Sequence, residues 1–379
     1  MLERLNIGVV GAAGRGASFR AALEAHPKTR IHAVCDIRED LLAETADRLG
    51  ASEMYADYQE MLDRSELDAV VIATPMHYHV PQAVQALQRD IHVLSEVPAA
   101  VSVKECRALV AAASASSAVY MMAENITYIR PNVLVRELVG RGLFGEVYYA
   151  EGEYLHELKE LNEITSWRRH WQTGIDGITY GTHSLGPILQ WMPGDRVVRV
   201  CCEGSGHHYV DPRGERYGNQ DSCVMLAKTA LGALIKIRVD MLSQRPHAMT
   251  NYCLQGTKGC YESARSAGEK HRIWLAELCE DANQWMDLAD LEEPFMPEMW
   301  RNPPDAALRA GHGGGDYFQV LDFVRSIIDG TPCPIGIHEA MDMALPGLVS
   351  QASIANGASW MDVPDSRSWQ DEPQARSGA

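Results

Sequence analysis

Two hydrophobic patterns follow one another along the chain, and the pattern changes near residue 125. Over residues 5–124, short runs that are wholly apolar, such as 7–10 and 69–73, alternate with segments whose apolar residues recur at helical spacing. Strands that are apolar on both faces and separated by helices predict an α/β fold, doubly wound on a parallel sheet.

After residue 128 the strand-like segments follow one another without helices between them. These segments are 145–155, 196–203, 221–228, 233–240, 249–256 and 270–276. Consecutive strands joined by turns predict an α+β domain with a large, mostly antiparallel sheet. The run is interrupted over 167–192, where a polar and aromatic loop is predicted to enter a helix. The polar residues 366–379 are predicted to form a disordered tail.

The first apolar run ends in a glycine-rich turn, and an alanine-rich helical pattern follows it. The residues of the turn are Gly11, Ala12, Ala13, Gly14, Arg15 and Gly16. Such a turn cradles a pyrophosphate, because glycines admit backbone N–H groups close to the phosphates and the helix N-terminus adds partial positive charge. The spacing departs from Gly-x-Gly-x-x-Gly at Ala13, whose side chain is small enough for a close approach. Glycine turns after strands are common, so the motif needs supporting context.

Asp36 supplies that context. It ends the second predicted strand, 30–35, and stands 20 residues after Gly16, where a carboxylate accepts hydrogen bonds from the adenosine ribose hydroxyls. The alternative role for Asp36 is a helix N-cap, since 37–49 has a helical pattern. Strand, turn, helix, strand and acid together predict a dinucleotide site. Asp36 would repel a 2′-phosphate and favour NAD over NADP, while Arg38 would soften that preference.

Further loops at the carboxyl ends of predicted strands are expected to line the cofactor, because ligands bind at that edge of open α/β sheets. The residues assigned to this lining are Thr74, Pro75, His77, His79, Glu96, Val97 and Asn125. His77 and His79 also raise the alternative of a metal site. No cysteine or acidic residue stands near them, so no bound metal is predicted.

Composition narrows the classes of partner. The 379 residues carry a formal net charge of −17, which argues against nucleic acid or an anionic membrane as a partner. The nine cysteines are scattered and include no Cys-x-x-Cys pair, so reduced thiols in a cytoplasmic protein are expected. Residues 1–4 run straight into a strand, and no apolar run approaches the roughly 18 residues of a membrane helix. Neither a signal peptide nor a membrane span is predicted.

A basic and aromatic segment precedes a helical pattern in the second half of the chain. Its residues are Trp167, Arg168, Arg169, His170 and Trp171. Aromatic rings stack on sugar faces, and arginine binds carboxylate, phosphate or sulfonate groups through paired hydrogen bonds. The segment therefore predicts a sugar substrate with an anionic group, such as a sulfosugar or a uronide. A solvated loop with one buried tryptophan is the alternative.

Short motifs spread over nearly the whole chain carry a family resemblance. They are the 11–16 turn, Asp36, Thr74-Pro75, Glu96-x-Pro98, Asn125, Gly142-x-x-Gly145, His183, His312-Gly-Gly-Gly-Asp316 and Val363-Pro-Asp365. Together they make the chain similar to the Gfo/Idh/MocA oxidoreductase family. The resemblance implies a doubly wound Rossmann domain over 1–124 and a substrate-binding α+β domain with a large open sheet over 125–365, with NAD bound between them. It also implies a homo-oligomer formed through the open sheet face.

Two departures from that family single out one of its branches. Most members have a lysine where this chain has Val97, and most place an aspartate at the position of Thr179, four residues before His183. The chain instead reads Tyr-Gly-Thr-His-Ser-Leu-Gly-Pro over 180–187. That segment resembles the NAD-dependent glycosidase branch, typified by bacterial α-N-acetylgalactosaminidases. NAD-dependent sulfoquinovosidases share the broader resemblance.

This branch implies glycoside hydrolysis by transient oxidation. NAD takes hydride from a sugar carbon, by resemblance C3, a base removes the acidified C2 proton, the C1 group leaves, water adds, and the hydride returns. Tyr180 and His183 are the candidate catalytic residues, and Tyr180 would need nearby positive charge to lower its pKa from about 10. The structural alternative places both in the first turn of a helix beneath the sheet. Tyr128, His156 and His312 are further candidates for substrate binding.

Two other functions stay open on the sequence alone. A plain sugar dehydrogenase or reductase would release its cofactor after each reaction, although the missing lysine at Val97 speaks against it. A non-catalytic dinucleotide-binding protein would keep the fold without the chemistry, although Tyr180 and His183 speak against that. In the two enzymatic readings the predicted substrate is a small sugar or glycoside.

Overall fold

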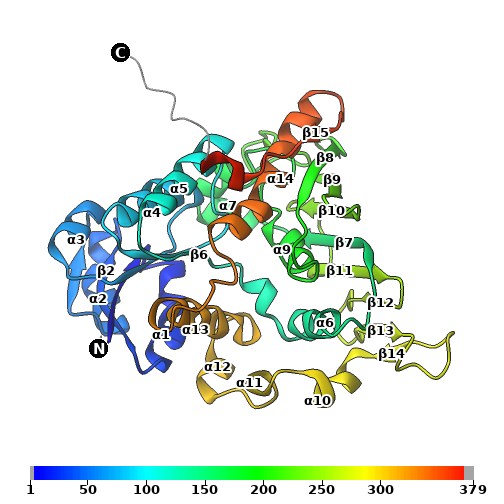
Figure 1. Cartoon of the computed structure of the whole chain (residues 1–379). Helices are drawn as coiled ribbons and strands as arrows, with labels where there is room; N and C mark the ends of the chain where they lie inside the picture. Colours follow the sequence, from blue (N-terminus) through cyan, green and yellow to red (C-terminus); the bar gives the residue numbers. More distant parts are fainter. Residues whose placement is uncertain (1–3, 371–379) are drawn as a thin grey trace.

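Two sheets built from successive parts of the chain lie side by side (Figure 1). The computed structural model describes residues 4–370. The first sheet has six parallel strands in the order β3-β2-β1-β4-β5-β6, which is the doubly wound order of a Rossmann domain. The strands are β1 (Leu5–Val10), β2 (Thr29–Cys35), β3 (Glu53–Tyr55), β4 (Ala69–Ile72), β5 (His92–Ser95) and β6 (Tyr120–Met122). The helices between them are η1 (Arg15–Phe19), α1 (Arg20–Ala25), α2 (Glu39–Leu49), α3 (Tyr58–Arg64), η2 (Met76–Tyr78), α4 (His79–Leu87) and α5 (Val103–Ala115).

The strands of this sheet are apolar because helices cover both of its faces. Every residue of β4 is buried, and β1 is buried at all but one position. Side-chain caps fix the starts of two helices, because Asp57 accepts a hydrogen bond from the Glu60 backbone N–H and Ser102 accepts one from that of Glu105. α2 ends at Gly50, whose φ of +66° suits a left-handed C-cap.

The second sheet is open and has nine strands in the order β14-β13-β12-β11-β7-β10-β9-β8-β15. All of its pairings are antiparallel except that of β7 with β10. The strands are β7 (Val147–Leu155), β8 (Val197–Gly204), β9 (Ser222–Thr229), β10 (Leu234–Asp240), β11 (Met249–Gly256), β12 (Gly259–Glu262), β13 (Arg272–Leu275), β14 (Met286–Asp287) and β15 (Met361–Asp362). The six predicted strands correspond to β7–β11 and β13, and the short β12, β14 and β15 were not predicted.

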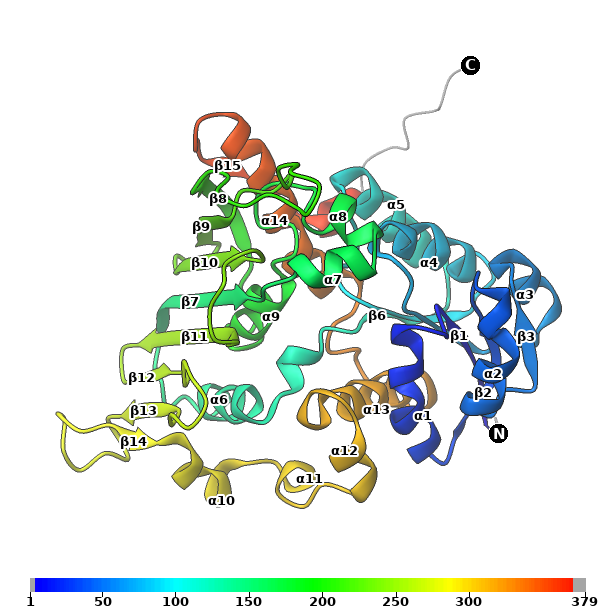
Figure 2. The same cartoon turned by 180° about the vertical axis from the view of Figure 1, so that it is seen from behind.

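Helix α9 (Thr182–Gln190) packs on the inner face of this sheet (Figure 2). Its close approach requires Gly152 of β7, because a Cβ there would lie 2.2 Å from the Ser184 carbonyl oxygen. The remaining helices are η3 (Asn125–Tyr128), α6 (Arg130–Gly140), α7 (Lys159–Ile164), α8 (Trp167–Trp171), η4 (Leu288–Leu291), α10 (Glu292–Phe295), α11 (Glu298–Arg301), α12 (Asp305–Arg309), η5 (His312–Gly314), α13 (Gly315–Ile328), α14 (Ile337–Ala355) and η6 (Ser366–Gln370). The tight contact between α9 and β7 fixes the first turn of α9, where His183 stands.

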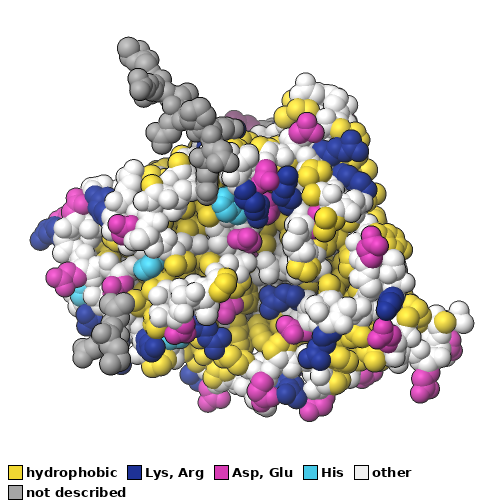
Figure 3. Space-filling view, viewed as in Figure 1, with side chains coloured by type: hydrophobic (Ala, Val, Ile, Leu, Met, Phe, Trp, Pro, Cys, Tyr) yellow, Lys and Arg dark blue, Asp and Glu magenta, His cyan; other side chains and the backbone are white. Residues whose placement is uncertain are grey.

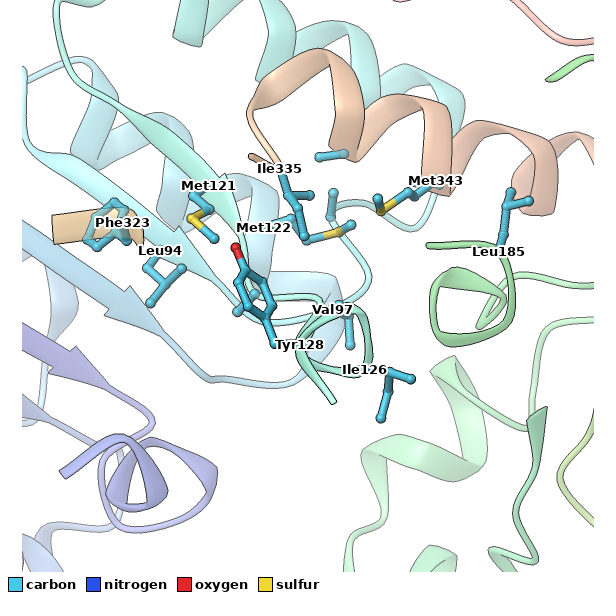
Figure 4. Packing of buried hydrophobic residues seen from close by; sticks show 14 of the residues in the cluster. Leu94, Val97, Met121, Met122, Ile126, Tyr128, Leu185, Phe323, Ile335 and Met343 are labelled. Atoms are coloured by element: carbon cyan, nitrogen blue, oxygen red, sulfur yellow. The ribbon is translucent and has the colours of Figure 1, made fainter. Parts of the chain in front are cut away.

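Helices α13 and α14 return to the Rossmann half, so the two halves share one core. α13 packs on α1, and α14 packs on α5 as well as on β8. Met122 donates its backbone N–H to the Ile335 carbonyl oxygen at 3.0 Å. Figure 4 shows Met122, Ile335 and Met343 in one apolar cluster. The predicted boundary at residue 124 is therefore a change of sheet across which later helices pack.

Part of the predicted tail is helical, which corrects the expectation of disorder for residues 366–370. Arg367 pairs with Asp342 at 2.9 Å, and the Arg107 guanidinium lies 4.6 Å from the centre of the Trp369 ring. These contacts hold η6 against α14 and α5. Residues 371–379, the rest of the predicted tail, lie outside the described residues, as do residues 1–3.

Acidic and basic side chains are mixed over the face drawn in Figure 3. The excess of acidic residues is not gathered into a single patch on this face. Between residues 4 and 370, no helix combines the length and the apolar character needed to cross a membrane.

Candidate active site

The glycine turn lies across the carboxyl ends of β1 and β4. Gly11 has a φ of +75°, and a Cβ there would lie 2.6 Å from the Ala73 carbonyl oxygen. A Cβ on Gly16 would lie 2.8 Å from Val9 Cγ1, so both positions need glycine. At Gly14 a Cβ would make only ordinary contacts, the nearest with Arg38 Nη2 at 3.4 Å. A turn of bare backbone before a helix is what a pyrophosphate needs, so these residues fit NAD.

Asp36 ends β2 beside the turn, and its carboxylate is well bonded. Oδ2 accepts the Ala13 backbone N–H at 2.9 Å, and Arg38 Nε donates to Oδ1 at 3.0 Å. Burial works against the charge, but the hydrogen bonds from Arg38 and Ala13 outweigh it and hold the pKa of Asp36 below its usual value. The N-cap of α2 is Arg38, so the capping alternative for Asp36 is not observed.

Arg15 joins the turn to two other segments. Its Nε donates to Glu96 Oε1 at 2.6 Å, and its Nη1 donates to Asp316 Oδ2 at 3.2 Å. Asn125 Nδ2 donates to Asp316 Oδ1 at 3.2 Å, and His312 Nδ1 lies 3.1 Å from the same oxygen. Burial works to raise the pKa of Asp316, but His312 and Arg15 outweigh it and hold the value at about 2. Three predicted cofactor residues and one predicted substrate residue thus meet in one charged network.

The loop after β4 gives its two histidines different roles. His79 is buried, with Nδ1 2.9 Å from the Pro98 carbonyl oxygen and Nε2 2.9 Å from that of Thr74. It ties two loops together, which corrects the expectation that it lines the cofactor. His77 instead stacks on Trp171 of α8, with ring centroids 4.7 Å apart and planes inclined by 12°. Burial lowers the pKa of both imidazoles, which keeps them neutral at neutral pH.

The first turn of α9 brings His183 to the buried carboxylate of Glu124, which no sequence motif indicates as a site residue. His183 Nδ1 donates to Glu124 Oε1 at 2.9 Å, and the Ile126 backbone N–H donates to the same oxygen at 3.1 Å. Glu124 is fully buried, and its Oε2 has no partner among the described residues. Burial favours the neutral ring, but the Glu124 charge outweighs it and raises the pKa of His183. The position of Glu124 in the sequence could have indicated it, because Glu124 comes just after β6 as Asp36 comes just after β2, at the edge of the sheet where ligands bind.

Tyr180 lies beside His183, but its hydroxyl is not activated. The ring centroids of the two residues are 5.5 Å apart, and the Tyr154 ring lies 5.5 Å from that of Tyr180. Burial raises the pKa of Tyr180 to about 12, and the opposing positive charges of Arg168 and Arg15 do not offset it. The lowered pKa that a tyrosine base would need is therefore not observed.

The end of β7 adds two more rings next to Tyr180. The Tyr154 hydroxyl lies 2.7 Å from His156 Nδ1, and the His156 ring meets the His247 ring edge-on with centroids 5.1 Å apart. Burial lowers the pKa of His156 to about 4, and the neighbouring His247 and Arg168 act in the same direction. His156 is therefore a neutral hydrogen-bonding group. Tyr154 and His247 were missed in the sequence, where neither stands in a motif.

Residues 167–171 form helix α8, where a loop was predicted. The Arg168 guanidinium lies 4.5 Å from the centre of the Trp167 ring and donates to Gln172 Oε1. Within residues 4–370 no carboxylate pairs with Arg168, and its charge acts on the Tyr180 hydroxyl. Substrate binding by Arg168 stays a prediction.

Arg169 is held on the other side of α8, which corrects its assignment to substrate binding. Its Nε donates to the buried Asp211 Oδ2 at 3.3 Å, and its Nη2 donates to the Arg216 carbonyl oxygen at 2.6 Å. Both partners belong to the loop between β8 and β9. Its neighbour His170 is exposed. The sequence could not divide adjacent basic residues between two sides of a helix that it predicted as a loop.

Tyr128 lies in the core, which corrects the expectation that it binds substrate. Tyr128 is 2% exposed, and its hydroxyl donates a hydrogen bond to Asp322 Oδ2 at 3.0 Å. Figure 4 shows its ring inside the apolar cluster, which also contains Val97. Because Val97 stands where most of the family has lysine, this loop supplies no amine to the site.

Comparisons with known proteins agree with this arrangement. Residues 5–124 match the model of the oxidoreductase family with an NAD-binding Rossmann fold, and residues 128–370 match that of the glycosyl hydrolase 109 C-terminal domain. A glycosyl hydrolase family 109 protein of Saccharopolyspora erythraea is 30% identical over 392 residues, which cover 96% of this chain and 83% of the relative. An α-N-acetylgalactosaminidase of Shewanella oneidensis is 28% identical over 96% of this chain and 85% of its own.

Solved structures share the fold over the same length. Levoglucosan dehydrogenase in complex with NADH and levoglucosan has a TM-score of 0.82 and 21% sequence identity, covering 96% of this chain and all of that one. The family match confirms the predicted cofactor, because the first domain is an NAD-binding Rossmann domain. The protein belongs to the Gfo/Idh/MocA oxidoreductases and, within them, to glycosyl hydrolase family 109.

Proposed function

We propose that this protein is an NAD-dependent glycoside hydrolase that oxidises its sugar transiently. The observation that carries the proposal is the Glu124–His183 couple, which stands beside Tyr180. The charges of Glu96 and Arg15 in the network at the glycine turn also act on His183. Family membership supports the proposal, because the relatives are named glycosyl hydrolase family 109 proteins and one is named α-N-acetylgalactosaminidase.

The side chains of the site divide the proton transfers between them. When bound at the glycine turn and Asp36, NAD would supply a hydride acceptor for one sugar carbon. The hydroxyl proton released with that hydride passes to solvent water and is taken back from water when the ketone is reduced again. His183 takes the acidified proton from the neighbouring carbon, because Glu124 holds its Nδ1–H and leaves Nε2 without a partner among the described residues. Glu124 stabilises the imidazolium that forms. Tyr180, with a pKa of about 12, keeps its proton and donates a hydrogen bond to a sugar oxygen.

Arg168 supports a substrate that carries an anionic group. No carboxylate among the described residues pairs with its guanidinium, and the nearby rings of Tyr154, Tyr180 and His156 are neutral at neutral pH. A cation beside neutral rings attracts a negative group on the ligand. Trp167 beneath the guanidinium keeps it in place through a cation–π contact.

Incubation with a panel of aryl glycosides tests the proposed activity. The panel holds a neutral N-acetylgalactosaminide, a uronide and a sulfosugar glycoside, each with and without NAD added to cofactor-stripped protein. Hydrolysis that requires NAD, with no NADH accumulating, is expected. NADH formed in proportion to the sugar consumed would instead identify a sugar dehydrogenase. Cofactor binding without reaction on any sugar would identify a non-catalytic protein.

The isotope content of the product separates the elimination route from direct displacement. Removal of the C2 proton by His183 lets that position exchange with solvent, so hydrolysis in D2O is expected to place deuterium on C2 of the released sugar. Direct displacement at C1 would leave C2 protiated and would contradict the proposed route.

We infer that the protein forms a homo-oligomer through the outer face of the nine-stranded sheet. Val224 and Leu226 of β9 are 39% and 37% exposed there, and such apolar side chains on an open sheet are suited to a partner surface. Sedimentation velocity is expected to give a mass above that of one chain, and a monomer at all concentrations would contradict the inference.

A further inference from the structure

A stacked ring pair joins the two halves of the molecule. Trp171 is the last residue of α8, and His77 belongs to η2 directly after β4. Their ring planes are inclined by 12° with centroids 4.7 Å apart, and the Tyr78 ring lies 4.2 Å from the same imidazole. Figure 2 shows α8 beside α4, the helix that continues from η2. The contact therefore links the second half directly to the Rossmann sheet.

This contact stands at the place where a dinucleotide crosses the first sheet. In the order β3-β2-β1-β4-β5-β6 the reversal falls between β1 and β4, and dinucleotides bind at the carboxyl ends of the strands there. The glycine turn follows β1 and the His77 loop follows β4. The two loops touch, because a Cβ on Gly11 would lie 2.6 Å from the Ala73 carbonyl oxygen. Trp171 thus reaches the cofactor side from the substrate-binding half.

The position of Trp171 is fixed from behind by the loop between β8 and β9. Arg169, two residues earlier, is bonded to Asp211 and to the Arg216 carbonyl oxygen. The Gly218 backbone N–H donates to the Thr173 carbonyl oxygen at 3.0 Å. α8 is a short helix with no buried residue of its own. These bonds, together with the ring stack, therefore hold it against the first half.

We propose that Trp171 and His77 form a clasp beside the NAD site that slows release of the cofactor. One face of the Trp171 indole is covered by His77, so that face does not stack on a sugar. His77 Nδ1 is buried without a hydrogen-bond partner among the described residues, so the ring contacts with Trp171 and Tyr78 hold this imidazole. The inference rests on NAD binding and not on hydrolysis.

The dissociation rate of NADH tests the clasp. Protein loaded with NADH is mixed with excess NAD, and NADH fluorescence, excited directly rather than through tryptophan, is followed in a stopped-flow instrument. Trp171→Ala is expected to raise the dissociation rate about two- to tenfold, the range that loss of one aromatic pair gives. Trp285→Ala is the matched tryptophan control and is expected to leave the rate unchanged, because Trp285 contacts Arg272 of β13 and lies outside the site.

Variants on the other half decide whether the pair acts as a unit. His77→Ala is expected to raise the rate as much as Trp171→Ala, and the double variant no more than either single one. His77→Phe keeps a flat ring and is expected to restore slow release. Unchanged release in Trp171→Ala, equal acceleration in Trp285→Ala, or additive effects in the double variant would each overturn the clasp. Since no sugar is present, failure here leaves the glycosidase proposal to its own tests.

Discussion

Arg15 and Arg168 both act by their charge on the Tyr180 hydroxyl, but their surroundings differ. Arg15 comes from the Rossmann half and donates to two carboxylates, those of Glu96 and Asp316. Arg168 comes from the second half, where a tryptophan ring and an amide oxygen are its partners. Carboxylates of the protein neutralise the charge of Arg15. No carboxylate among the described residues neutralises Arg168, so its charge stays available to a ligand.

The same difference extends to the groups around each arginine. On the cofactor side, the bonds of Arg15 to Glu96 and Asp316 join the start of η1 to the loop after β5 and to the first turn of α13, which gives a fixed frame. On the substrate side, Tyr154, Tyr180 and His156 are neutral rings, and the Glu124–His183 couple beside them can take up a proton. A site needs a rigid frame of ion pairs to hold a cofactor steadily, and neutral groups beside it to exchange protons with a sugar.

The largest effect is expected from removing His183, the residue proposed to accept the substrate proton. His183→Ala is expected to lower kcat by about a hundred- to ten-thousandfold, the range of general-base catalysis. NAD affinity should stay the same, because His183 takes no part in the Arg15 network. Aglycone release and deuterium at C2 are the two measurements. Full deuterium exchange in this variant would assign the base to Tyr180 instead.

A second change removes the charge behind His183 and keeps the shape. His183 must be neutral to accept a proton, so activity falls as the pH drops below its pKa, which Glu124 raises above the usual 6.5. Glu124→Gln lowers that pKa, so the acidic limb of kcat/KM is expected to move to lower pH. The maximum should fall about tenfold or more, because the remaining base is weaker.

The conservative variant Glu124→Asp provides the control for that profile. It keeps the negative charge, so its acidic limb is expected to stay near that of the unchanged protein even if its maximum falls. Identical pH profiles in Glu124→Gln and Glu124→Asp would mean that Glu124 serves packing alone. Cofactor titration with both variants checks that the Rossmann half is intact.

Helix α8 offers the same comparison between two adjacent arginines. Arg169 pairs with Asp211, whereas no carboxylate among the described residues pairs with Arg168. Arg168→Ala is expected to raise KM for an anionic glycoside about ten- to a hundredfold, since a charge-assisted hydrogen bond contributes about 1.5–3 kcal/mol. A neutral glycoside should be affected far less. Arg169→Ala should leave KM unchanged and instead destabilise the fold by about 1 kcal/mol, because Asp211 loses one of its partners.

Steady-state kinetics on both substrates and thermal unfolding of both variants give the readout. Equal losses on the anionic and the neutral glycoside in Arg168→Ala would make α8 a structural segment. A rise in KM with unchanged stability in Arg169→Ala would place Arg169 in the site, against the bonds that it makes.

Local signals predicted the parts of the site that lie close together in the sequence. The glycine turn and Asp36 belong to one strand–helix–strand unit. The apolar periodicity of its strands and helix, and the spacing between the glycines and Asp36, can be seen directly in the sequence. Glu124 and His183 are 59 residues apart, and their contact depends on Gly152 and Gly186 letting α9 approach β7 and η3. No local pattern encodes that approach. Family resemblance located His183 but gave no partner for it.

For other residues the sequence prediction was wrong, because segments that are distant in the sequence supply their contacts. Tyr128 follows the last Rossmann strand closely enough to suggest a site residue, yet α13 comes back across it and offers Asp322 as a partner. Arg168 and Arg169 are adjacent in sequence, and only the loop between β8 and β9 decides which of them is neutralised. Residues 366–370 are polar, but α14 presents Asp342 to Arg367. In each case a distant segment supplies the contact.

The smallest expected effect concerns the cofactor side, where a charge pair meets the ribose. Arg38 Nε and Nη2 donate to the two oxygens of Asp36, and the Arg38 side chain is 47% exposed. The pair partly cancels the repulsion that Asp36 would exert on a 2′-phosphate, so NAD is expected to bind better than NADP by a modest margin. Arg38→Ala removes the cancelling charge and should widen the margin by about two- to fivefold, because exposed pairs contribute about 0.2–1 kcal/mol. Asp36→Ala should narrow or reverse the preference for NAD over NADP.

Titration of both dinucleotides against each variant gives the ratios of their affinities directly. Equal or tighter binding of NADP by the unchanged protein would remove Asp36 from the ribose site, and with it the view that the paired side of the molecule is already arranged for NAD.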